Sequence, residues 1–119
     1  MNSPSDEEPQ PELKRGQLVP VVLAGAYGKP RPALVIQSDL FAKHPSITVL
    51  PITSDLRPIE TFRILVAPNP QNGLRTTSQI MVDKAHTIPR EKAGQPFGEL
   101  ESATLTAVNR ALAVFLGLG

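Results

Sequence analysis

Cysteine and tryptophan are absent from this 119-residue chain, and histidine and aromatic residues are scarce. Without cysteine the chain forms no disulfide and offers no thiolate to a metal ion. Its two histidines show no HExxH or HxxxH spacing and no carboxylate cluster accompanies them, so we predict no metal site and no cofactor. One tyrosine and four phenylalanines leave few rings for a stacking platform.

Long apolar runs are also missing. The longest apolar stretch near a terminus, ALAVFLG at residues 111–117, is much shorter than a membrane span. The N-terminal residues are acidic and lack the basic and apolar regions of a signal peptide. We therefore predict a cytoplasmic protein that does not engage a membrane.

Charge is nearly balanced, at +1, but it is unevenly distributed. Residues 1–12 contain four acidic side chains and no basic one, which leaves twelve basic against seven acidic residues in the remainder. We expect residues 1–12, rich in proline, serine and acid, to be a disordered acidic tail and residues 13–119 to form one domain. The tail is either inert or screens the basic remainder, which is compatible with binding an anionic polymer.

Short runs rich in Val, Ile, Leu and Thr follow the tail, and breaks such as AGAYGKP and APNPQNG separate them. Closely spaced strands with Gly and Pro turns predict a mainly β fold, an antiparallel barrel or sandwich. The Asn72-Gly73 pair is a strong turn signal. The predicted strands are 17–23, 32–37, 46–51, 61–66 and 77–83.

Two helical segments are expected among these strands. Ser38 and Asp39 are suited to cap a short turn that ends before Pro45. A longer helix is predicted near the C-terminus, with Ser102 as its N-cap and Gly117 as its terminator. Its apolar stripe is expected to close the core on one side of the barrel and consists of Leu105, Val108, Leu112 and Phe115.

The stretch GKPRPALVIQSD, residues 28–39, holds Arg31 between two prolines. Proline fixes its own backbone angle and biases the preceding residue toward an extended conformation. Arg31 would therefore sit on a stiff approach to a strand, a suitable place to hold a guanidinium that meets a planar anion such as a phosphate. The alternative is an arginine that only marks a loop and points into water.

Further candidates are Thr53 and Ser54 after the third strand, Arg75 with residues 76–78, and Asp83 at the end of the fifth strand. Hydroxyl pairs are common in turns and caps, and Asp83 beside Lys84 also fits an exposed ion pair. The chain has no GxSxG, P-loop or GxGxxG pattern.

Tyr27, in the loop GAYGK, is the best candidate for stacking on a base, because cationic Lys29 and Arg31 follow it at alternating positions. Packing within the loop is the alternative for this ring. His44 and His86 remain candidates for proton transfer, although His44, before Pro45, also suits a surface loop.

Five segments in order resemble the MazF/PemK family of bacterial toxins over residues 14–118: KRGQLV, KPRPALVIQSD, TVLPITS, GLRTTSQIMVDKAHTIPREK and AVNRALAVFLGL. The resemblance implies a small SH3-like antiparallel barrel with a C-terminal helix, acting as a homodimer. Family members cut single-stranded RNA at short preferred sequences without metal, and a cognate antitoxin holds them inactive. Such cleavage leaves a 2′,3′-cyclic phosphate and a 5′-hydroxyl.

On the family pattern, Arg31 matches the arginine of the RP motif and Thr53 the threonine of the PITS-type block, so both are predicted to be catalytic. Arg31 would stabilise charge on the phosphoryl oxygens, and Thr53 would donate a hydrogen bond beside it. The general acid and base stay open among His44, His86, Asp83 and Arg75. The predicted RNA contacts are Tyr27, Lys29, Ser54, Arg75 and Asp83.

Two departures from the family pattern bear on the site. Met81 stands where certain relatives carry an arginine, and the loop AGAYGKP lacks the glutamate common before the RP motif. Two alternatives share the expected fold: a poison of DNA gyrase like the CcdB relatives, and a non-catalytic module that only binds RNA or antitoxin. The RP and PITS blocks favour the nuclease.

Overall fold

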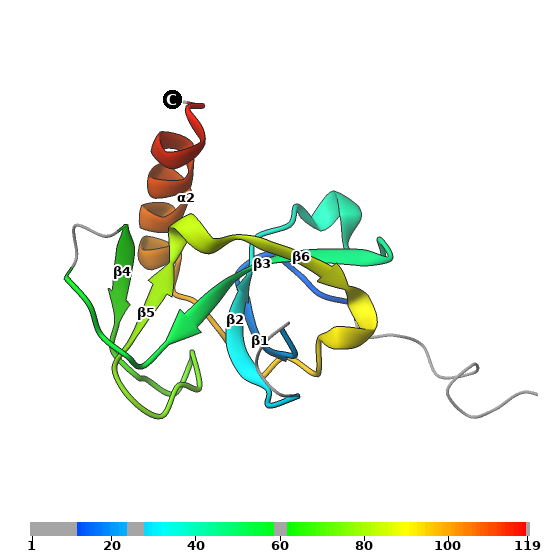
Figure 1. Cartoon of the computed structure of the whole chain (residues 1–119), viewed down its shortest axis with the longest axis horizontal. Coiled ribbons are helices and arrows are strands. Elements are labelled where there is room, and N and C mark those ends of the chain that lie inside the picture. The colour runs from blue at the N-terminus through cyan, green and yellow to red at the C-terminus, as the bar shows by residue number, and fades with distance from the viewer. Residues whose placement is uncertain (1–11, 24–27, 59–61, 119) are drawn as a thin grey trace, which may run out of the picture.

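Strand β3 (Ser46–Thr53) is the centre of the fold, because it pairs with three other strands. The computed structural model describes residues 12–23, 28–58 and 62–118, and its strands form one curled antiparallel sheet (Figure 1). The sheet order is β4-β5-β3-β2-β1-β7, and β6 also pairs with β3. The other strands are β1 (Gln17–Val21), β2 (Arg31–Val35), β4 (Arg63–Val66), β5 (Ser78–Met81), β6 (His86–Pro89) and β7 (Gly98–Glu99). The predicted mainly β, antiparallel fold is confirmed.

Strand β3 uses both of its edges. One edge pairs with β2, and the other pairs with β6 along its first half and with β5 at its end. A 3₁₀ turn, η3 (Val82–Lys84), lies between β5 and β6. Both strands on either side of this turn therefore pair with β3, at different positions along it. The strand predicted over residues 77–83 therefore ends at Met81, and the prediction that Asp83 ends that strand is wrong.

The apolar core consists of two clusters, because successive side chains of a strand point to opposite faces. Leu18, Leu34 and Leu50 belong to the first cluster, which the helix covers. Their strand neighbours Val19 and Val49 belong to the second cluster, together with Leu13. Packing of the described chain thus begins at Leu13, and the predicted acidic tail lies outside the described residues except for Glu12.

Helix α2 (Ser102–Leu116) packs beside β4 and η3 and buries Val108 and Leu112 in the first cluster (Figure 1). The predicted closure of the core on one side is confirmed. The N-cap prediction is wrong by one residue, because Ser102 is already helical and Glu101 is the cap. Gly117 ends the helix as predicted, in a left-handed conformation with φ of 75° that glycine adopts without strain.

The short helical segment predicted after Ser38 is a 3₁₀ turn, η1 (Asp39–Phe41), in which the Leu40 N–H donates to Ser38 Oγ at 3.2 Å. A second such turn, η4 (Arg90–Lys92), follows β6. In the described parts of the chain, none of the helices is long and apolar enough to cross a membrane.

Candidate active site

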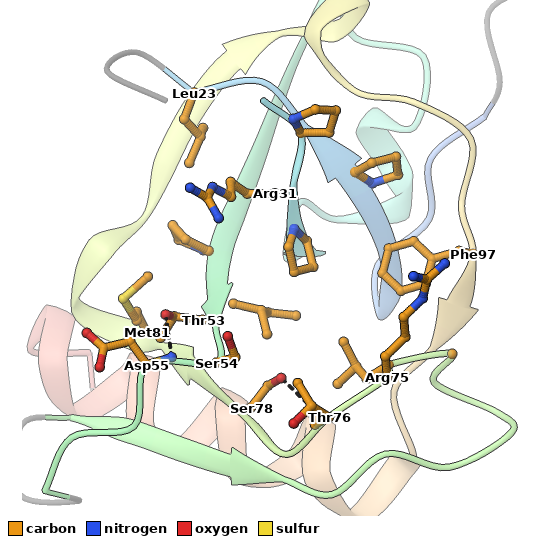
Figure 2. Close-up of a pocket in the computed structure, with 17 residues that line it drawn as sticks. Leu23, Arg31, Thr53, Ser54, Asp55, Arg75, Thr76, Ser78, Met81 and Phe97 are labelled. Atoms are coloured by element: carbon orange, nitrogen blue, oxygen red, sulfur yellow. Dashed lines mark hydrogen bonds between the residues drawn. The ribbon is translucent and has the colours of Figure 1, made fainter. Parts of the chain in front are cut away.

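An open groove of about 910 Å³ lies where β2 begins and β3 ends (Figure 2). Four prolines line it, and two of them, Pro20 and Pro32, face each other in the β1–β2 ladder. Proline fixes its own backbone angle, so this part of the groove is stiff. The polar side chains that line the groove are those of Arg31, Thr53, Ser54, Asp55, Arg75, Thr76 and Ser78.

Arg31 and Thr53 form one side of the groove, which we call the strand wall. Arg31 is the first residue of β2 and Thr53 the last residue of β3. The β2–β3 register pairs Ala33 with Pro51, and its continuation by two residues sets Arg31 opposite Thr53. Figure 2 shows both side chains on the same side of the pocket. The exposed Arg31 guanidinium makes no hydrogen bond or ion pair with the described residues, so it is free to meet an anion.

Thr53 is held by the turn that follows it. The backbone N–H of Asp55 donates to Thr53 Oγ1 at 3.0 Å, a contact drawn as a dashed line between the two residues in Figure 2. The hydroxyl group therefore accepts from inside the protein, and its own O–H is left to donate into the groove. The Asp55 carboxylate accepts from Arg57 Nε and Nη2 at 3.2 and 2.9 Å, but both side chains of this pair are largely exposed.

Gln79, only 2% exposed, fixes the loop after Thr53. Its side-chain oxygen accepts from the Arg57 N–H at 2.9 Å, and its side-chain nitrogen donates to the Arg57 carbonyl at 2.8 Å. The same oxygen accepts from Arg63 Nη1 at 3.1 Å. Gln79 was not among the sequence-based candidates, although a polar residue inside the apolar run SQIMV was a signal that could have identified it.

The opposite side of the groove is built from loops, and we call Arg75, Thr76 and Phe97 the loop wall. Arg75 and Thr76 belong to the long connection between β4 and β5, and Phe97 directly precedes β7. Figure 2 shows Arg75 and Phe97 on the side of the pocket away from Arg31. Ser78, at the start of β5, donates its hydroxyl to the Thr76 carbonyl at 2.9 Å.

Buried Asn72 organises the loop that carries Arg75. Its side-chain oxygen accepts from the N–H groups of Asn69 and Leu74, at 3.1 and 2.9 Å, and its side-chain nitrogen donates to the Ala67 carbonyl at 2.9 Å. Gly98 lies so close that a β-carbon there would approach the Asn72 carbonyl oxygen to 2.1 Å. The predicted turn at Asn72-Gly73 is confirmed, with a φ of 69° at Gly73.

The structure brings together Arg31, Thr53, Ser54 and Arg75 among the predicted site residues. Lys29 is exposed but does not line the groove. Asp83 lies outside the groove, and its carboxylate is 3.5 Å from Lys84 Nζ. This is the ion pair that the sequence offered as the alternative to a site residue. Tyr27 falls outside the described residues.

Both histidines also lie outside the groove. The Ser46 N–H donates to His44 Nδ1 at 3.1 Å, and His86 Nδ1 lies 2.6 Å from the Lys84 carbonyl oxygen. Met81 does line the groove. Within the described ranges, no three His, Cys, Asp or Glu side chains are grouped in a way that would hold a metal ion.

The comparisons with known proteins agree on one family. The family model described as "PemK-like, MazF-like toxin of type II toxin-antitoxin system" matches residues 14–116. A "Probable endoribonuclease MazF" of Mycolicibacterium smegmatis is 40% identical over 107 residues, which cover 89% of this chain and 98% of that protein. "Endoribonuclease MazF4" of Mycobacterium tuberculosis is 30% identical and covers 74% of this chain and 80% of its own length.

Solved structures agree with this match. Mycobacterium tuberculosis toxin MazF-mt6 superposes with a TM-score of 0.73 at 26% identity, covering 87% of this chain and 98% of that one. A mycobacterial endoribonuclease in complex with its cognate antitoxin gives a TM-score of 0.70 at 25% identity, covering 91% and 96%. Because the family model and the 40% identical relative both span nearly all of the sheet and helix described above, the chain belongs to the PemK-like, MazF-like toxin family of type II toxin–antitoxin systems.

Proposed function

We propose that this protein is a toxin endoribonuclease that cleaves single-stranded RNA in the cytoplasm, as a homodimer controlled by a cognate antitoxin. The 40% identical relative carries the name endoribonuclease, and a related endoribonuclease was solved with its antitoxin. The observation that carries the proposal is the strand wall, where an unpaired guanidinium and a threonine hydroxyl line one open groove. Exposed apolar side chains at the end of α2, Val114, Leu116 and Leu118, support a contact with another protein chain.

The proposed reaction uses the RNA's own 2′-hydroxyl as nucleophile. Its oxygen attacks the adjacent phosphorus and loses its proton, the bond from phosphorus to O5′ breaks, and O5′ takes a proton from water. The products are a 2′,3′-cyclic phosphate and a 5′-hydroxyl. Negative charge grows on the phosphoryl oxygens, and the planar guanidinium of Arg31 suits two of them at once.

Thr53 has the second role in this mechanism. Its hydroxyl oxygen already accepts from the Asp55 N–H, so its proton is directed elsewhere and can be donated to a phosphoryl oxygen. The prolines on both sides of Arg31 and the ladder that positions Thr53 hold the two groups before the substrate binds. Such preorganisation avoids a reorganisation cost during the reaction.

Asp55 is our candidate for the base that removes the 2′-hydroxyl proton. Arginine stays charged at neutral pH and is a poor base, so Arg31 and Arg75 do not suit this role. Among the described residues that line the groove, Asp55 alone carries a carboxylate. Its ion pair with Arg57 is largely exposed, and such pairs contribute little, so substrate can readily displace Arg57.

The test incubates purified protein with a long unstructured RNA in EDTA and identifies the ends that are produced. We expect cleavage that leaves a 2′,3′-cyclic phosphate, with strong loss in Thr53→Val, which removes the hydroxyl and keeps the shape. Thr87→Val is the matched control, because Thr87 lies on β6 outside the groove and its hydroxyl bonds to Thr48. Absence of cleavage by the folded wild type would contradict the proposal and favour the gyrase-type or binding-only alternative.

A further inference from the structure

Phe97 is an exposed aromatic ring in the groove that the proposed mechanism does not use. The residue is 41% exposed, although burial of a phenylalanine stabilises a protein. The other described phenylalanines have ring partners: Phe62 and Phe115 pack together with centroids 5.5 Å apart, and Phe41 contacts the His44 ring edge-on at 6.4 Å. Phe97 has no ring partner among the described residues, and it lines the groove.

The backbone of Phe97 is firmly held. Its N–H donates to the Leu18 carbonyl at 2.9 Å, and the next residue, Gly98, pairs with Leu18 in the β1–β7 ladder. On its other side lies Gly73, where a β-carbon would come within 2.6 Å of the Phe97 carbonyl oxygen and 3.0 Å of the ring atom Cδ1. The ring is therefore placed before any ligand arrives, which lowers the entropy lost on binding.

Arg75 lies on the same wall and adds a positive charge to this apolar surface. Its guanidinium makes no hydrogen bond or ion pair with the described residues. An aromatic face together with a cation is the combination that binds single-stranded nucleic acid, since the ring stacks on a base and the cation meets the backbone phosphate. An apolar peptide side chain would use the ring but not the neighbouring charge.

We propose that Phe97 stacks on the base of a nucleotide that flanks the scissile phosphate, while Arg75 contacts the phosphate backbone beside that base. The inference rests on the proposed ribonuclease function and adds a second subsite to it. Every base has a flat π-face, so this subsite requires that a base be present at one position without selecting which base. The sequence had pointed to Tyr27 for stacking, which falls outside the described residues, whereas Phe97 is the aromatic ring among the described residues that line the groove.

The test uses short RNAs that contain one mapped cleavage site and a single abasic nucleotide at each flanking position in turn. For the wild type, we expect KM to rise about tenfold at one position and little elsewhere, a loss typical of one stacked base. Phe97→Leu should show the raised KM already with intact RNA and no further rise with the abasic RNA. Phe97→Tyr keeps a ring and should restore the abasic penalty at the same position that Phe97→Leu loses.

Phe41→Leu is the matched control, because Phe41 is also exposed but does not line the groove. An equal abasic penalty in wild type and folded Phe97→Leu would overturn the inference, and so would a wild-type scan in which no flanking position needs its base. Failure of the wild type to cut any intact RNA would instead overturn the proposed function. The two failures are therefore distinguishable.

Discussion

The strand wall and the loop wall of the groove differ in how their side chains are held. Arg31 and Thr53 lie on paired strands whose backbone hydrogen bonds fix their relative position. Arg75 and Phe97 lie on loops that depend on side-chain hydrogen bonds of Asn72 and on two glycines that permit close packing. The difference indicates a division of labour, in which the strand wall performs the chemistry and the loop wall binds the flanking RNA.

Catalysis and RNA binding differ in how much displacement of a side chain they tolerate. Displacement of a group that stabilises a transition state by 1 Å can cost about a hundredfold in rate. A stacked base and a phosphate contact tolerate small shifts, because neither depends on a single angle. Substitutions in the strand wall should therefore lower kcat, and those in the loop wall should mainly raise KM.

The largest effect is expected for Arg31. Arg31→Ala should lower kcat by roughly 10²–10³, the usual loss when a donor to a developing oxyanion is removed. Arg31→Lys should restore only part of the rate, since an ammonium cannot make two parallel hydrogen bonds to a phosphoryl group. Single-turnover cleavage measures both, with Arg110→Ala on the exposed face of α2 as charge-matched control. Full activity in Arg31→Lys would show that bidentate contact is unnecessary.

Gln79→Leu should have the next largest effect, because it leaves the N–H and carbonyl of Arg57 without their side-chain partner. Unsatisfied groups of this kind cost about 1–3 kcal/mol of unfolding free energy, measured by urea denaturation. The loop with Ser54 and Asp55 would loosen, so kcat should fall as well, at temperatures where the variant is folded.

Gln37 supplies a matched control for Gln79. Its side chain likewise bonds to backbone groups, those of Phe41, Ser46 and Thr48, each at 3.0 Å, but it lies outside the groove. Gln37→Leu should lose stability while kcat of the folded fraction stays near the wild-type value. Equal kcat in both variants would show that Gln79 does not position the residues of the strand wall.

Gly98→Ala probes the support of the loop wall. The added methyl group would lie 2.1 Å from the Asn72 carbonyl oxygen, so the backbone must move. Forced overpacking costs about 1–3 kcal/mol of stability. We expect KM to rise more than kcat falls, with exposed Glu99→Ala in the same strand as control. A fall in kcat alone would contradict the division between the two walls.

The smallest effect is expected for Arg75→Gln. Removal of one phosphate contact should reduce the slope of log K against log salt by about 0.7 for a single strand, with little change in kcat. Binding of a 2′-deoxy-substituted RNA at several salt concentrations measures this, since that RNA cannot be cut by its own hydroxyl. Lys29→Gln is the comparison, because Lys29 is exposed and lies outside the groove. Equal slopes in wild type and Arg75→Gln would exclude a backbone contact at Arg75.

Local patterns predicted much of this molecule correctly. Short runs rich in Val, Ile, Leu and Thr between Gly and Pro breaks indicated the strands, and the spacing of Val108 and Leu112 indicated the helix that covers the sheet. Arg31 stood out because of its two flanking prolines, which is a local constraint. The strand β6 was missed, since its sequence HTIP is not an apolar run and only Ile88 among its residues is buried.

The sequence by itself determined the antiparallel class, the C-terminal helix and the stiff setting of Arg31, because each depends on neighbouring residues. Only the tertiary structure decided which side chains share the groove, because register and loop packing join residues far apart in the chain. Continuation of the β2–β3 register brings Arg31 to Thr53, whereas η3 carries Asp83 away. Phe97 lies in the groove because its N–H bonds to the Leu18 carbonyl and its backbone lies close to Gly73. No local sequence pattern encodes these contacts.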